Sequence, residues 1–241
     1  MSNHVLLTVE AHRALRIDTR RDPALGDAMM SCLIPPDEFR QAQNHYPILF
    51  HRPPGGDRFQ AVALFGFHPG ENLFLEADGW DAAYLPLAMT IQPFLIGAPT
   101  SPGAAPSVHI DMASPRILRA PDAEGAAVFD EAGRPTDYLE TIAEQLGALD
   151  AGYWRSADFF SALRRHDLLE PLAVEMMLED GGFERLVGFH VIDEARLAAL
   201  DADSIAALHA EGHLQPIYMA IASLANLAAL IARKNRRSRH G

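Results

Sequence analysis

Near residue 135 the spacing of apolar residues in this 241-residue chain changes. Before that point apolar residues form short runs separated by proline and glycine, whereas after it they recur every three or four positions. Short bounded runs are typical of strands, and the longer period is typical of helices. We therefore expect an α+β fold: a mostly antiparallel, strand-rich half at about 1–135 and a helical half at about 136–241 that contains one further β-hairpin. The length and a hydrophobic fraction of 49% suit a single domain over residues 1–241.

The first half contains five runs that we expect to be strands. FQAVALFGF and NLFLEA are separated by only four residues, HPGE, so these two runs should pair as an antiparallel hairpin. A turn leading into a short helix is expected at IPPDEF (34–39), where two prolines precede acidic residues. The predicted strands occupy residues 46–51, 59–67, 72–77, 90–97 and 107–112.

The second half contains segments with helical periodicity and recognisable start signals. Thr136 and Asp193 each stand immediately before such a segment, where a side-chain oxygen can accept a hydrogen bond from the first helical turn. Proline is tolerated in a first turn, so Pro216 marks the approximate start of the last helix. The predicted helices occupy residues 137–149, 156–172, 194–200, 204–212 and about 216 onward.

A second hairpin is expected between about 172–178 and 184–192. Asp180, Gly181 and Gly182 separate the two apolar runs, and these residue types supply the positive φ angles of tight hairpin turns. The chain should then pass directly from this hairpin into the helix that Asp193 caps.

The last helix is apolar over much of its circumference. One predicted face consists of Ile217, Ile221, Leu224, Ala228 and Ile231. The apolar stretch 217–232 is interrupted by Ser223 and Asn226, and it is shorter than the roughly 20 residues of a membrane span. We therefore expect no transmembrane segment, and we expect a core helix or a homo-oligomer interface instead.

The segment that follows, 233–239, concentrates positive charge in an otherwise acidic chain. It carries five arginine or lysine residues, whereas the whole chain has a formal net charge of −12. We expect these residues to complement the negative end of the last helix and then to fray into water. The acidic balance of the rest disfavours nonspecific binding to nucleic acid or to anionic membrane.

The single cysteine and the first residues bear on the cellular compartment. Cys32 has no second cysteine to pair with, and its apolar neighbours predict a buried, inert thiol. Residues 1–18 lack a basic segment followed by an apolar core of signal-peptide length. We therefore expect a cytoplasmic protein.

One pattern indicates a metal site. His109 and Asp111 are two positions apart on a predicted strand, so their side chains share a face, as in a facial triad for non-haem iron. His190 could be the third ligand, and Arg196 could bind the acidic co-substrate of an iron-dependent oxygenase. The alternative is that these are ordinary surface and core polar residues. We favour the second interpretation and predict no metal and no cofactor.

Other polar and aromatic residues admit a similar choice. His209 and His213 have helical metal-ligand spacing, but Gly212 between them more often ends a helix. His68 and Glu71 could be an acid–base pair, although the sequence HPGE is equally typical of a four-residue turn. Four aromatic residues could line a pocket or pack in the core: Trp80, Tyr84, Tyr153 and Trp154.

Several segments, in this order, resemble the SapC family of bacterial proteins. Early in the chain these are DEFRQAQNHYPILF, ALFGFHPGENLFL and GWDAAYLPLAMTIQPF. Later they are VFDEAGRPT, GFHVIDEARLAAL and GHLQPIYMAIASLANL, so the resemblance covers about residues 4–232. The chain departs from the family pattern at Thr90, Ile91 and Gln92, where basic and aromatic residues are common.

The resemblance implies an accessory role and brings no catalytic residues with it. The family name comes from surface-layer systems, and relatives are often encoded beside tryptophan-halogenase-like proteins and TonB-dependent receptors. We therefore expect a non-catalytic accessory or binding protein with a protein partner, serving uptake or modification of a substrate. The alternatives are the iron-dependent oxygenase and a surface-layer-associated structural protein.

Overall fold

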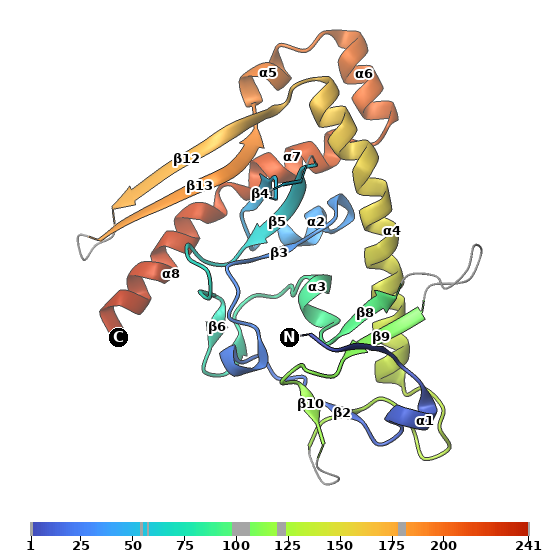
Figure 1. The fold of residues 1–241 in the computed structure, drawn as a ribbon. Helices are drawn as coiled ribbons and strands as arrows, with labels where there is room; N and C mark the ends of the chain where they lie inside the picture. The colour runs from blue at the N-terminus through green and yellow to red at the C-terminus, as the bar shows by residue number, and fades with distance from the viewer. Residues whose placement is uncertain are drawn as a thin grey trace.

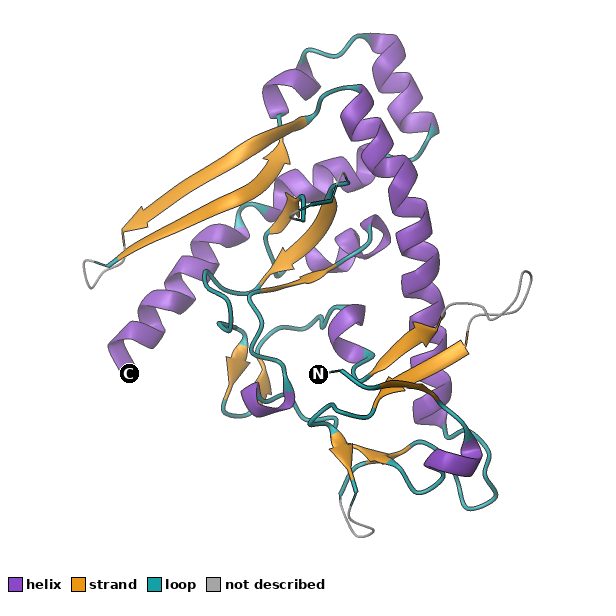
Figure 2. Ribbon diagram, in the orientation of Figure 1, coloured by secondary structure: helices purple, strands orange, loops and turns teal. Residues whose placement is uncertain are grey.

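The computed structural model describes residues 2–53, 55–56, 58–97, 107–119, 124–177 and 182–240. It has the expected α+β composition, with antiparallel sheets drawn mostly from the first half and helices mostly from the second (Figure 2). Two apolar clusters form the interior, one around the largest sheet and one around a smaller sheet near the N-terminus.

The largest sheet combines strands from both halves of the chain. Its order is β12-β13-β4-β5-β3, and every neighbouring pair is antiparallel. The predicted second hairpin is confirmed, although Asp180 and Gly181 of its turn lie outside the described residues. β13 joins the sheet by pairing with β4 at Phe189–His51 and His190–Phe50. The five strands are β3 (Ser31–Leu33), β4 (Ile48–His51), β5 (Gln60–Leu64), β12 (Leu169–Met177) and β13 (Phe183–Ile192).

The hairpin predicted between 59–67 and 72–77 is wrong. β5 lies between β4 and β3, while β6 (Leu75–Glu76) pairs with β7 (Gly79–Trp80). Only one backbone hydrogen bond, from Leu73 N to Phe65 O at 2.8 Å, joins the two predicted partners. The reason is that β5 is buried on both faces from Ala61 to Leu64, so it occupies an interior position with a strand on each side.

Two further three-stranded sheets and short helices form the N-terminal part. The strand predicted at 107–112 is confirmed as β9 (Ser107–Asp111). Only the second half of the strand predicted at 90–97 is correct, as β8 (Phe94–Gly97), because residue 90 ends a short helix and residues 91–93 form a turn. β1 (His4–Leu6) extends this pair on the side of β9. The other sheet has the order β10-β2-β11. Its strands and the short helices are β2 (Arg16–Ile17), β10 (Ile117–Leu118), β11 (Ala126–Ala127), α1 (Val9–His12), η1 (Pro23–Leu25), η2 (Pro36–Glu38), α2 (Phe39–Ala42) and α3 (Leu87–Thr90).

One long helix replaces the two helices predicted at 137–149 and 156–172. α4 (Asp137–Arg165) runs for 29 residues, and the Thr136 side chain accepts a hydrogen bond from Leu139 N, as expected of its cap. The connecting residues contain Gly152, which the helix uses for close packing, since a Cβ there would lie 2.8 Å from Pro35. α4 ends seven residues before the predicted end, and the residues from Leu169 onward belong to β12.

The C-terminal half ends in four helices. α5 (Glu194–Ala198) is capped by Asp193 as predicted, and α6 (Ala202–Ala210) follows it. The predicted last helix is divided into α7 (Leu214–Ser223) and α8 (Asn226–His240). By length and composition alone, the stretch Leu214–Arg239 could also cross a membrane, a criterion that helices of folded domains sometimes meet.

The division between α7 and α8 changes which face is buried. The predicted face is only partly correct, because Ala228 is exposed and the buried positions are Ile217, Ala220, Ser223 and Leu230. The two polar residues of the stretch explain the division. Ser223 Oγ accepts a hydrogen bond from Ile48 N at 2.9 Å, and Asn226 Nδ2 donates one to Gln43 O at 2.7 Å. Self-association through the exposed face stays a prediction.

The basic C-terminal segment does not fray, contrary to our expectation. α8 continues to His240, and its basic side chains bind the segment 71–81. Arg233 donates to Asp81 at 2.6 Å and lies 4.4 Å from the ring centre of Phe74, while Lys234 donates to Glu71 at 2.6 Å. Because these carboxylates and carbonyl groups stabilise the basic side chains on one face, the helix continues instead of unwinding.

Candidate functional site

The structure separates the three residues of the predicted iron site. His109 and Asp111 share a face of β9 as expected, but His190 lies on β13 in a different sheet. Asp111 instead accepts hydrogen bonds from Asn3 N at 2.7 Å and Ala113 N at 3.0 Å, which lower its pKa. Among the described residues, no group of three or more His, Cys, Asp or Glu side chains is placed to hold a metal ion.

His190 and Arg196 have separate local environments. The His190 ring lies 4.8 Å from the ring of Phe59, and its buried Nδ1 has no hydrogen-bond partner. Burial lowers the pKa of His190, and the nearby charge of Arg52 lowers it further. Arg196 is held by Asp167 and by Asp193, the latter at 3.6 Å, so it contacts the start of its own helix.

Contacts within the fold account for three of the remaining candidate residues, Gly212, Glu71 and Cys32. Gly212 has a φ of 78°, beyond the last residue of α6, so it ends the helix between His209 and His213 as predicted. Glu71 holds its turn by accepting from Phe67 N at 2.7 Å and also binds Lys234. Cys32 is buried, and burial raises the pKa of its thiol.

Trp80 and Tyr84 are half-buried and belong to a hydrogen-bond network packed against the core rather than to a pocket wall. Trp80 Nε1 donates to Tyr46 Oη at 2.8 Å, and Tyr84 Oη donates to Glu38 Oε2 at 2.6 Å. Burial raises the pKa of Glu38, whose other oxygen has no hydrogen-bond partner. These contacts confirm packing against the core for the pair Trp80 and Tyr84. Of the other pair, Trp154 is 77% exposed on α4, and Tyr153 lines a cavity.

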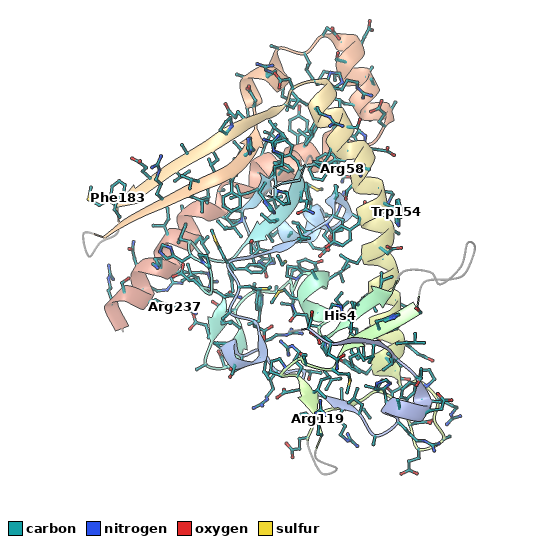
Figure 3. All side chains as sticks on the ribbon, viewed as in Figure 1. His4, Arg58, Arg119, Trp154, Phe183 and Arg237 are labelled. Carbon is teal, nitrogen blue, oxygen red and sulfur yellow. The ribbon has the colours of Figure 1, made fainter. Side chains whose placement is uncertain are left out.

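This cavity is a groove of about 720 Å³ between α4 and the sheet. Residues of α4 at spacings of three and four form one wall, and the start of β5 with the loop before it forms the other. Figure 3 shows Arg58 beside β5 and Trp154 projecting from α4. The groove is lined by Leu33, Ile34, Arg52, Arg58, Phe59, Gln60, Ala61, Tyr153, Ser156, Ala157, Asp158, Phe160, Ser161 and Arg164.

The charges that line the groove are mostly positive. Arg52, Arg58 and Arg164 are exposed there, and among the described residues that line the groove Asp158 is the acidic one. Arg52 also lies 6.0 Å from the ring centre of Phe59, which fixes a guanidinium beside an aromatic surface. The groove is therefore a locally cationic site on a chain whose formal net charge is −12.

Buried aromatic rings support the apolar wall of the groove. Phe160 lies 5.5 Å from Phe159 and 6.0 Å from Phe50, with the rings edge to face. Phe50 and Phe159 are fully buried, so they support Phe160 from below. Burial raises the pKa of Tyr153 further above neutral, so its hydroxyl stays protonated and can donate a hydrogen bond. The site combines a preformed apolar surface with cationic and hydrogen-bonding groups, the usual composition of a ligand pocket.

Sequence reasoning did not identify these arginines as a group. Arg52 and Arg58 flank the loop PPGGD, whereas Arg164 is more than 100 positions further along the chain. Prolines and glycines with charged flanks are typical of a loop, but periodicity alone cannot show which helix faces it. Antiparallel pairing and the position of α4 bring the three residues together.

Comparison with known families gives one result. The family model described as SapC matches residues 7–230, which is most of the chain and includes all residues that line the groove. Neither curated proteins nor solved structures give a match.

Proposed function

We propose that this chain, which belongs to the SapC family, is a binding protein without catalysis of its own, and that its ligand occupies the groove between α4 and β5. The observation that carries the proposal is the convergence of arginines from two distant segments, the loop 52–58 and α4, beside a packed aromatic surface. Such a site favours a ligand that combines an anionic group with an apolar body.

The chemistry of guanidinium groups supports binding. Arginine stays protonated at any physiological pH, so it attracts an anion but does not exchange protons with it. Its planar donors match the two oxygens of a carboxylate or phosphate. Phe59 and Phe160 offer apolar area beside these donors, and Asp158 can accept a hydrogen bond from a polar group of the ligand.

The expected accessory role agrees with this proposal. A cytoplasmic protein that holds an anionic, partly apolar molecule could serve a substrate uptake or modification system. The oxygenase alternative would need a third ligand other than His190 beside His109 and Asp111, since His190 lies in another sheet. A surface-layer-associated structural protein stays the other alternative.

Fluorescence of anilinonaphthalene sulfonate tests the proposal, because this probe joins a sulfonate to apolar rings. We expect saturable binding at one site, with a dissociation constant that rises about tenfold in the variant Arg52→Gln/Arg164→Gln. Phenylnaphthylamine, which lacks the sulfonate, should bind both proteins equally. Arg155→Gln is the matched control, because Arg155 lies on α4 but pairs with Asp37 outside the groove. Equal sulfonate affinity in all three proteins would refute the proposal.

A further inference from the structure

The outer half of the β12–β13 hairpin has one face that no helix covers in the described part of the chain. Figure 1 shows the hairpin extending away from α4, with α7 and α8 along its other side. The orientation of the faces follows from pairing. Phe50 contacts Phe159 and Phe160 of α4 and is paired with His190, so His190 is on the α4 side of the sheet.

The strand register shows which residues share that side with His190. His190 pairs with Pro171, Arg185 with Glu175, and Phe183 with Met177, and the β12 positions alternate by two. Positions 171, 173, 175 and 177 therefore lie on one face together with their partners. A bulge places Val187 and Gly188 opposite Ala173, so Val187 belongs to the same face.

This face exposes three large apolar side chains. Met177 is 75% exposed, Phe183 is 63% exposed and Val187 is 55% exposed. On the opposite face Leu186 is buried, and Leu172, Val174 and Phe189 pack against the main apolar cluster. The hairpin thus already packs one face against the body of the protein, and the large apolar side chains on the other face are not needed for that packing.

The exposed strip is continuous with the groove. His190 packs against Phe59, which lines the groove. Arg52, which also lines the groove, is close enough to lower the pKa of His190. From His190 to Phe183 the strand spans seven steps, or roughly 23 Å at about 3.3 Å per residue. A small molecule that fills the groove cannot also cover a strip of this length.

We propose that the groove and the hairpin strip together bind an extended peptide segment of a partner protein, with acidic residues in the groove and apolar residues on the strip. This inference rests on the proposed function, because it assigns the anionic group of the ligand to acidic side chains. Charge complementarity selects this occupant. The groove carries three arginines and one aspartate, whereas Arg185 and Glu175 on the strip form an ion pair at 3.7 Å and leave it neutral. The net charge of −12 disfavours an anionic membrane as the occupant.

Fluorescence anisotropy of a labelled twelve-residue peptide tests the inference. One end of the peptide carries glutamates and the other carries phenylalanine and leucine; a second peptide has serine in place of glutamate. We expect Met177→Ser/Phe183→Ser to raise the dissociation constant of the first peptide about tenfold without changing binding of anilinonaphthalene sulfonate. Arg52→Gln/Arg164→Gln should weaken both probes, and the serine peptide should bind weakly to all proteins. Tyr218→Ser, a change at an exposed aromatic residue on α7, is the control. It should change neither the dissociation constant of the first peptide nor that of anilinonaphthalene sulfonate.

Each other outcome has a definite meaning. Unchanged peptide affinity in the hairpin variant would overturn this inference and leave the groove proposal standing. Unchanged affinity of both probes in the arginine variant would refute the proposed function as well. Binding to phosphatidylserine vesicles that the hairpin variant loses, or a dimer in light scattering that it loses, would overturn the inference in favour of a membrane or a second copy.

Discussion

A fully buried ion pair between Arg116 and Asp27 provides the sharpest stability test. The Arg116 side chain is 1% exposed and that of Asp27 is 0% exposed. Arg116 Nη2 donates to both carboxylate oxygens at 2.5 and 2.6 Å, and Nη1 donates to Asp18 O at 3.0 Å and Arg20 O at 2.8 Å. One guanidinium therefore joins three separate residues of the segment 18–27 to the position immediately before β10.

Arg116→Met removes these four hydrogen bonds and leaves the charge of Asp27 buried. The remaining donors to the Asp27 carboxylate are Asp22 N at 2.9 Å and Arg21 Nη1 at 3.4 Å, and they stabilise its buried charge only in part. Breaking a buried pair by removing one member costs about 3–5 kcal/mol, and we expect a loss of this size in the free energy of unfolding. Arg116→Lys keeps the positive charge but lacks the planar guanidinium donors, so the decrease in the free energy of unfolding should be smaller than for Arg116→Met.

Urea unfolding followed by tryptophan fluorescence measures the effect, because Trp80 is stacked on Phe74 in the core. The urea concentration at the unfolding midpoint should fall, while the slope of the unfolding free energy against urea concentration should stay constant. Arg116→Met/Asp27→Leu should lose less than the sum of the two single changes, by about 2–3 kcal/mol, because each single change leaves one member of the Arg116–Asp27 pair buried without the other. A loss below about 1 kcal/mol in Arg116→Met would refute the reasoning, since it would mean that solvent or another group compensates Asp27.

Four further expectations follow from particular contacts. Arg233→Ala should lower the unfolding free energy by about 1–2 kcal/mol, because Arg233 contacts both Asp81 and Phe74; an unchanged urea midpoint would contradict this. Iron analysis after incubation with ferrous iron and desalting should find substoichiometric metal; near-stoichiometric iron that His109→Ala loses would instead favour the oxygenase. Burial, and secondly the charge of Arg52, lower the pKa of His190 in the folded protein below its ordinary value of 6.5. Below about pH 6.5 the unfolded chain therefore binds more protons than the folded protein, so the free energy of unfolding should decrease as the pH falls. His190→Gln should weaken this pH dependence in urea titrations, and an identical pH profile would exclude His190 as a source. The exposed face of α7 should support self-association, so Tyr218→Glu should lower the mass measured by light scattering at high protein concentration; an unchanged mass would exclude this face.

Features set by neighbouring residues could be predicted from the sequence. Thr136 and Asp193 cap helices through hydrogen bonds to residues three positions later, and Gly212 ends α6 by adopting a positive φ. The β12–β13 hairpin pairs residues that are close in the sequence. In each case the stabilising contact lies within a few positions or across one turn, so composition and spacing contain the information. The family resemblance over most of the chain was also visible at this level and agrees with the match to residues 7–230.

Features that depend on distant contacts were decided only by the tertiary structure. β5 has apolar residues on both faces, a pattern that fits several pairings, and packing selected β3 and β4 over the nearby segment 72–77. The basic residues after position 232 became a helix because carboxylates and carbonyl groups of 71–81 lie opposite them. His190 lies far from His109 because β9 and β13 belong to different sheets. The groove combines Arg52 and Arg58, which flank one loop, with Arg164, which is more than 100 positions later. No local pattern relates the loop to α4, because their proximity results from strand pairing and from the packing of the helix.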